Sequence, residues 1–175
     1  MKKILALVLS TMLLLSASFA MAQSVDVEQA TDTFNVTMVI PEGYTMQEER
    51  QSDTLCINVI PEDKVAPEYR ITIAYGEEYD GRTLSELTEE EQNALIGSVD
   101  DDFQNRKLSS YTTGGGTLVY VMDENDSESD YATAFTLYKG YFIQMYVATP
   151  TFATLSEANI QMAIDLLTGM QFVDK

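Results

Sequence analysis

The chain has 175 residues, a single cysteine, no histidine and a formal net charge of −18. A surface this acidic repels phosphate backbones and anionic lipid headgroups, which argues against nucleic acid and membrane surfaces as partners. The lack of histidine excludes histidine-based catalytic triads and histidine metal ligands, and one cysteine cannot form a disulfide within the chain.

Residues 1–22 have the pattern of a secretory signal peptide. Lys2 and Lys3 precede an apolar run from Ile4 to Leu15, and the small residues that follow predict cleavage before Gln23. The run is too short to span a membrane, although a retained N-terminal anchor is an alternative. We therefore expect a secreted or periplasmic protein with no membrane insertion after cleavage. It would keep 8 basic and 28 acidic side chains, a net charge of −20.

The remaining chain, about 150 residues, is long enough for one domain with a sizeable core. Residues 23–32 are polar and predict a flexible leader, and residues 33–175 predict a single domain. Its first strand candidates are 34–40, 55–60 and 69–75, which can form a meander. Cys56 lies inside an apolar run and is predicted to be a small buried core residue.

The period of the apolar residues becomes helical after residue 83. Thr83 with Glu86, and Thr88 with Glu91, are two possible capping boxes, in which each side chain binds the backbone N–H of the other. The spacing predicts a short helix that leads into a longer one ending after Phe103.

Two hairpins are predicted next. Residues 111–113 and 117–122 flank three glycines, and residues 131–150 form two strands that fold back at Lys139-Gly140. With a two-residue turn, Tyr138 and Tyr141 fall on one face of the second hairpin, and Tyr146 falls on the other. Both faces carry apolar residues, which indicates that this hairpin is central in a sheet.

A final helix is predicted from the capping pair Thr154 and Glu157 to Gly169. Its buried stripe is spaced at i, i+3, i+4 and i+7, as expected for a helix that packs with one face. The residues of this stripe are Ile160, Ala163, Ile164 and Leu167. Strands before and after a helix, followed by a last helix, indicate an α+β fold.

The order of these elements resembles that of the PsbP-like superfamily. The resemblance rests on a first strand running into Pro41-Glu42-Gly43-Tyr44, a mid-chain helix, long antiparallel strands and a final helix closing into 169–173. The superfamily includes the extrinsic PsbP protein of photosystem II, a Ran-binding nuclear import factor and exported bacterial domains. Tyr44 stands where the family often has tryptophan.

This resemblance implies a central antiparallel sheet of about six to seven strands flanked by helices, an α/β/α sandwich. It also implies binding or assembly and not catalysis. It transfers no site residues, because the members of the superfamily bind unrelated partners.

An acidic segment, residues 123–130, is a candidate calcium site. Its possible ligands are Asp123, Asn125, Asp126 and Asp130, since calcium prefers several oxygen ligands. The segment does not match an EF-hand, because Glu128 occupies the glycine position and Ala134 the position of the closing glutamate. The alternative is a solvated acidic hairpin tip that discourages aggregation.

Two further groups of residues are candidates for function. Glu77, Glu78 and Asp80 precede the helical region and Asp100–Asp102 follow it, so a cleft between them would suit a hydrolase that uses paired carboxylates. Tyrosine combines apolar area with a hydroxyl group and is frequent in binding surfaces. The hairpin tyrosines Tyr138, Tyr141 and Tyr146 therefore predict a binding site, with half-buried strand residues as the alternative.

Together these patterns predict an exported, non-catalytic binding or accessory module of the bacterial cell envelope or exterior. Its partner would be a protein or a small ligand of unknown identity, and no cofactor is expected apart from calcium at the acidic segment. A hydrolase with paired carboxylates and a calcium-binding structural domain are the competing hypotheses.

Overall fold

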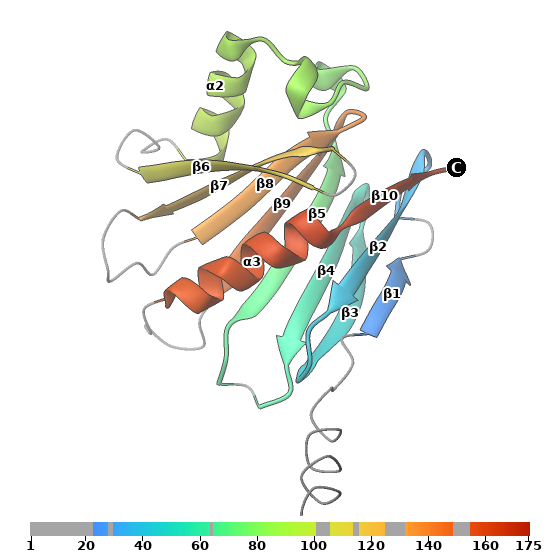
Figure 1. Cartoon of the computed structure of the whole chain (residues 1–175). Coiled ribbons are helices and arrows are strands. Elements are labelled where there is room, and N and C mark those ends of the chain that lie inside the picture. Colours follow the sequence, from blue (N-terminus) through green and yellow to red (C-terminus); the bar gives the residue numbers. More distant parts are fainter. Residues whose placement is uncertain are drawn as a thin grey trace, which may run out of the picture.

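The computed structural model describes residues 23–27, 30–63, 65–100, 106–113, 116–124, 132–148 and 155–175. They form two antiparallel sheets, two α-helices and two short 3-10 helices (Figure 1). The α+β class with a central antiparallel sheet is therefore confirmed, and a second, smaller sheet adds to the prediction.

The larger sheet has seven strands, with β9 in the middle. The register pairs Tyr138 with Tyr141, so Lys139 and Gly140 form the predicted two-residue turn, and both have positive φ, 50° and 80°. The strands in spatial order are β3 (Tyr44–Gln51), β4 (Thr54–Pro61), β5 (Glu68–Tyr75), β9 (Tyr141–Ala148), β8 (Ala132–Tyr138), β7 (Leu118–Glu124) and β6 (Arg106–Thr112).

The smaller sheet joins the two ends of the described chain. Its order is β1 (Gln23–Val27), β2 (Phe34–Ile40) and β10 (Gln171–Asp174). The flexible leader predicted for residues 23–32 is therefore wrong, because β1 pairs with β2 and Val27 is fully buried. The predicted meander also differs, since β3 takes the place of β2 beside β4.

Both faces of the central sheet are covered in part. The main core lies between one face, helix α3 (Glu157–Gly169) and the smaller sheet, with Ala134 of β8 buried there. On the other face, Phe135 and Leu137 pack against η2 (Leu84–Glu86) and α2 (Glu89–Val99). Figure 1 shows α3 crossing in front of the sheet and α2 at its upper end. The two apolar faces predicted for the hairpin are thus confirmed.

The mid-chain helices begin as their sequence predicts. At α2, the Thr88 hydroxyl accepts the Glu91 N–H at 3.3 Å, and the Glu91 carboxylate accepts the Thr88 N–H at 2.8 Å. The capping box at Thr83 is also present. Helix α2 ends at Val99, earlier than predicted, and Phe103 lies outside the described residues.

The start of α3 differs from its prediction. Ser156 is the N-cap, and Asn159 replaces the acidic partner of the usual box, with its Oδ1 accepting the Ser156 N–H at 3.0 Å. Thr154 lies outside the described residues. The helix ends at Gly169, as predicted.

An aromatic cluster joins the two sheets. Phe34 of β2 is fully buried, and its ring meets three other rings nearly at right angles. The centroid distances are 5.1 Å to Tyr138, 5.2 Å to Tyr141 and 5.6 Å to Phe172. Phe172 of β10 also stacks on Tyr138 at 4.6 Å. Edge-to-face pairs of this kind add to the stabilisation from burial.

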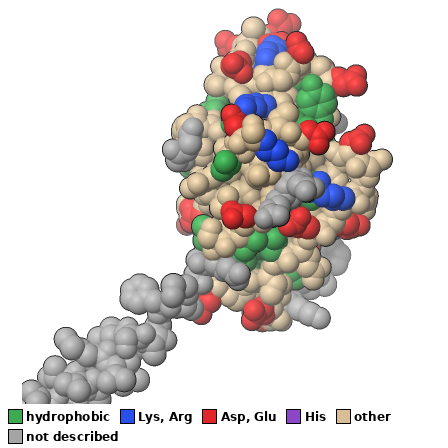
Figure 2. Space-filling model, turned by 90° about the vertical axis from the view of Figure 1, so that its right-hand side faces the viewer, with side chains coloured by type: hydrophobic (Ala, Val, Ile, Leu, Met, Phe, Trp, Pro, Cys, Tyr) green, Lys and Arg blue, Asp and Glu red, His purple; other side chains and the backbone are tan. Residues whose placement is uncertain are grey.

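The surface agrees with the acidic composition. On the face seen in Figure 2, the basic side chains lie among acidic ones. Within the described ranges, no helix has both the length and the apolar composition needed to cross a membrane.

Candidate functional site

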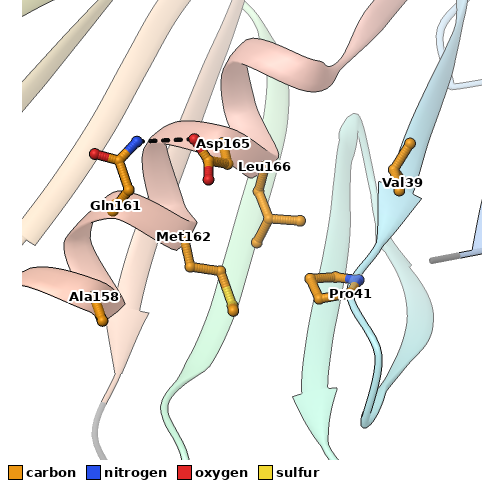
Figure 3. Close-up of a pocket in the computed structure, with 7 residues that line it drawn as sticks. All are labelled: Val39, Pro41, Ala158, Gln161, Met162, Asp165 and Leu166. Carbon is orange, nitrogen blue, oxygen red and sulfur yellow. Dashed lines mark hydrogen bonds between the residues drawn. The ribbon is translucent and has the colours of Figure 1, made fainter. Parts of the chain in front are cut away.

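A groove between helix α3 and strand β2 has mostly apolar walls. It encloses about 400 Å³. Figure 3 shows Met162 and Leu166 of α3 on one side, facing β2 across the groove. The residues that line it are Val39, Pro41, Ala158, Gln161, Met162, Asp165 and Leu166.

Two neighbouring stripes on α3 explain this wall. The predicted stripe, from Ile160 to Leu167, packs into the main core. Ala158, Met162 and Leu166 form a second stripe at i, i+4 and i+8, which lies beside the first on the helix. Because this helix is apolar over a wide face, it covers the sheet and still presents apolar side chains to the groove.

The opposite wall comes from the end of β2. Alternate residues of this strand, among them Met38 and Ile40, are buried, whereas Val39 points outward and is 46% exposed. Pro41 follows at the turn into β3. The exposed Val39 thus lies beside a hollow lined by half-buried Met162 and buried Leu166, and apolar walls of this kind are common in ligand sites.

One acidic group lines the groove, and two others are next to lining residues in the sequence. Asp165 lines it and accepts a hydrogen bond from the Gln161 side-chain amide at 2.8 Å. Glu42 directly follows Pro41 in the sequence, and Glu157 directly precedes Ala158; both are exposed. Among its described lining residues there is no lysine or arginine. The site therefore combines apolar walls with a negative border.

Tyr69 of β5 fixes α3 above the sheet. Its phenol is fully buried and donates a hydrogen bond to the Asn159 carbonyl oxygen at 3.3 Å. Burial, and then the neighbouring Tyr44, raise the pKa of the Tyr69 phenol well above its ordinary value. The phenol therefore stays protonated in the folded protein at a pH where it ionises in the unfolded chain.

This shift predicts a loss of stability at alkaline pH. Above about pH 10 the folded state binds more protons than the unfolded state, so the free energy of unfolding falls as the pH rises. In Tyr69→Phe this fall should be smaller, while the lost hydrogen bond costs about 1 kcal/mol at neutral pH. Urea unfolding at pH 8 and pH 10.5 measures both effects. Tyr146→Phe is the control, and an unchanged alkaline fall in Tyr69→Phe would contradict the assignment.

The three tyrosines predicted to bind do not form one surface. Tyr138 and Tyr141 lie on the core face of the hairpin and contact Phe34. Tyr146 lies on the opposite face, beside Arg70 and Thr133 of the neighbouring strands, and is 39% exposed. A binding site shared by all three is therefore not formed in this structure.

Two of these tyrosines each border a smaller hollow. Tyr138 lines one of about 360 Å³ with Thr113 and Met170, and Tyr141 lines one of about 350 Å³ with Tyr75 and Arg50. Both hollows are more polar than the groove. The Tyr138 hydroxyl also donates to Asp174 at 3.3 Å, and burial and this carboxylate raise its pKa. Tyr138 thus has a structural role of its own.

The acidic segment is described only at its start. Asp123 lies in β7, opposite Ala132 of β8 and Lys107 of β6. Asn125, Asp126 and Asp130 lie outside the described residues. In the part of the chain that is described, no three side chains of His, Cys, Asp or Glu are grouped to hold a metal ion. Calcium binding at residues 123–130 stays a prediction.

Four of the six acidic residues considered for a hydrolase site lie in the described part of the chain. Glu77, Glu78 and Asp80 belong to the exposed turn around η1 (Glu77–Tyr79), and Asp100 is the C-cap residue of α2. Asp101 and Asp102 lie outside the described residues.

The position of Cys56 also differs from the prediction. It is half-buried on the sheet face opposite the main core, beside Glu49 and Thr72. The apolar run that contains it is nevertheless a strand, in which its neighbours Leu55 and Ile57 point into the core.

Comparisons with known proteins give a similarity of structure without a match of sequence. A scan against protein-family models finds no match, and a search of curated proteins also finds none. Among solved structures, the chain is similar to cyanobacterial PsbP from Synechocystis sp. PCC 6803, with 11% sequence identity and a TM-score of 0.49. The similarity covers 89% of this chain and 95% of that one. The similarity is one of fold, to a protein of the superfamily whose order of elements this chain resembles.

Proposed function

We propose that the protein is exported by its N-terminal leader and acts outside the cytoplasm as a non-catalytic binding module. Its recognition site is the groove between α3 and β2. The observation that carries this proposal is the apolar surface formed by Val39, Met162 and Leu166 around a hollow of about 400 Å³. A hollow of this size can hold several side chains of a partner or one small ligand.

Three described carboxyl groups are poorly suited to acid catalysis near neutral pH. A general acid that works near neutral pH needs a raised pKa, as in glycosidases. The pKa values of Glu86 and Glu91 are instead lowered by hydrogen bonds from backbone N–H groups at helix caps. The pKa of Asp174 is lowered by a hydrogen bond from Lys139. These hydrogen bonds stabilise helix caps and the contact between Asp174 and Lys139. None of the three carboxyl groups lies at the groove.

The acidic border indicates the kind of partner. With a net charge of −20 after removal of the leader, the protein would attract cationic partners over a distance set by the ionic strength. The groove adds apolar area to this attraction. A protein segment that carries both apolar and basic side chains matches both properties.

The test is affinity capture with the exported protein. The full chain is expressed in an exporting bacterium and recovered from the periplasm or medium, where its first residue should be Gln23. It is then used as bait on an extract of the native cell envelope. In the variant Ala158→Trp, an indole occupies the groove, so the captured partner should be lost.

The matched control is Ala94→Trp, at an exposed position of α2 far along the chain from the groove residues. It should capture the partner as the unmodified protein does. Equal capture by both variants would contradict the assignment of the groove, and an intact leader on cytoplasmic protein would contradict export.

A further inference from the structure

Strand β2 has neighbours of unequal length. On one side, β1 pairs with residues 36–40, as far as Ile40. On the other side, β10 pairs with residues 34–37 and its pairing begins at Gln171 opposite Thr37. Within the described part of the chain, no strand continues beside Met38, Val39 and Ile40 on that side.

The gap coincides with the groove. Helix α3 ends at Gly169, and Met170 leads directly into β10, so the body of the helix lies across from the unpaired end of β2. Figure 3 shows Val39 and Pro41 on one side of the space and the α3 side chains on the other. The apolar hollow therefore lies along the part of β2 that β10 leaves unpaired.

A strand in this position would present its side chains alternately. One set would follow the inward residues Met38 and Ile40 and contact Met162 and Leu166. The other set would point outward with Val39, toward a border that includes Asp165. Apolar side chains suit the first set, and lysine or arginine suits the second, because opposite charges there attract.

We propose that the groove binds an extended segment of a partner protein, with alternating apolar and basic residues, as a fourth strand beside the free end of β2. The three residues from Met38 to Ile40 span roughly 10 Å of strand, enough for a short segment. Main-chain hydrogen bonds to β2 give affinity, and the alternating contacts give specificity. This inference rests on the proposed function of the groove and names the mode in which it acts.

Labelled hexapeptides and the purified protein test the mode. The parent probe, acetylated and amidated, alternates valine and lysine, and a control replaces each valine with serine at the same charge. Fluorescence anisotropy at 0.15 M salt should show saturable binding of the parent and at least roughly tenfold weaker binding of the serine peptide. Equal affinity of the two would overturn the proposal, because charge alone would then explain binding.

N-methylation separates strand addition from side-chain docking. Alternate amides of an added strand face β2, so methylating the valine amides and methylating the lysine amides should differ in effect. One methylated peptide should bind at least roughly tenfold more weakly, and the other should bind like the parent. Equal effects of the two methylations would exclude an added strand.

Substitutions in the protein complete the test. Asp165→Lys should weaken binding of the parent peptide, and Glu48→Lys, which makes the same charge change at an exposed position of β3, should not. Self-association that Ala158→Trp abolishes would identify a second copy as the occupant. Binding of a fluorescent fatty acid without peptide binding would identify a lipid, and either result would overturn the proposal.

These experiments distinguish the mode of binding from the location of the binding site. If the native partner is lost in Ala158→Trp but the methylated peptides behave alike, the added strand is wrong and the proposed function remains. If Ala158→Trp captures the partner normally, the groove itself is not the site.

Discussion

Replacement of Phe34 with alanine should lower the free energy of unfolding by about 3 to 5 kcal/mol. The ring is fully buried and lies within 5.6 Å of three other aromatic rings, measured between centroids. Alanine removes these contacts and leaves a cavity between the two sheets, where rings from β8, β9 and β10 cannot all move inward together. This is the largest effect that we expect from any single substitution described here.

The measurement is urea unfolding followed by circular dichroism, with Phe34→Leu as the control. Leucine keeps the site apolar and fills most of its volume, so the loss should be about 1 to 2 kcal/mol. If alanine and leucine cost the same, the ring cluster does not join the sheets as described. A change in the denaturant slope would instead indicate that the smaller sheet has separated from the larger one.

Gly140→Ala should be the second most damaging change, at about 2 to 4 kcal/mol. Gly140 has a φ of 80°, which disfavours any residue with a Cβ atom. A Cβ added there would also lie 2.8 Å from the backbone nitrogen of Gly81 and 2.8 Å from the Tyr75 ring. The neighbouring backbone cannot move freely, because Gly140 N–H donates to the Arg82 carbonyl oxygen at 2.8 Å.

Gly43→Ala separates the cost of the positive φ from the cost of the close contact made by an added Cβ atom. Gly43 has a similar φ of 75°, but a Cβ there would meet nothing within 4 Å. It should therefore show only the backbone cost, about 1 kcal/mol. Thermal unfolding of both variants gives the comparison. A Gly140→Ala protein as stable as Gly43→Ala would mean that the contact with Gly81 is not close in solution.

The parts of the fold that could be predicted depend on local signals. The central hairpin follows from two β-rich runs around Lys139-Gly140, and the two capping boxes follow from Thr83 and Thr88. These features are set by residues a few positions apart, so a sequence pattern reveals them. The same holds for the end of α3 at Gly169.

The strands that were missed owe their existence to distant partners. Strand β1 carries only Val25 and Val27 among polar residues, and β3 is exposed along most of its length, so neither shows a strong alternation. Strand β10 has four residues, too few for a periodic signal. Each of them is formed by pairing with a more buried strand, and pairing of this kind cannot be predicted from local sequence.

In the candidate site, too, features set by neighbouring residues could be predicted and features set by distant segments could not. The hairpin register places Tyr146 on one face of the sheet and Tyr138 and Tyr141 on the other face. This could be predicted from the two-residue turn. Grouping the three as one site relied on their closeness in sequence, which in a strand does not mean a shared face. The groove combines Val39 with a second stripe of α3, and nothing in either segment alone indicates that they meet.

The smaller sheet also affects the order in which parts of the protein can fold. Lys175 donates a hydrogen bond to the Thr31 carbonyl oxygen across 144 positions, and β10 closes the sheet that β1 and β2 begin. Contacts of such long range form slowly, because a long loop must be closed first. While the chain is being synthesised, the smaller sheet therefore stays incomplete until β10 has been made. A late closure of this kind would leave the nascent chain loosely folded for longer, which would favour the export that we propose.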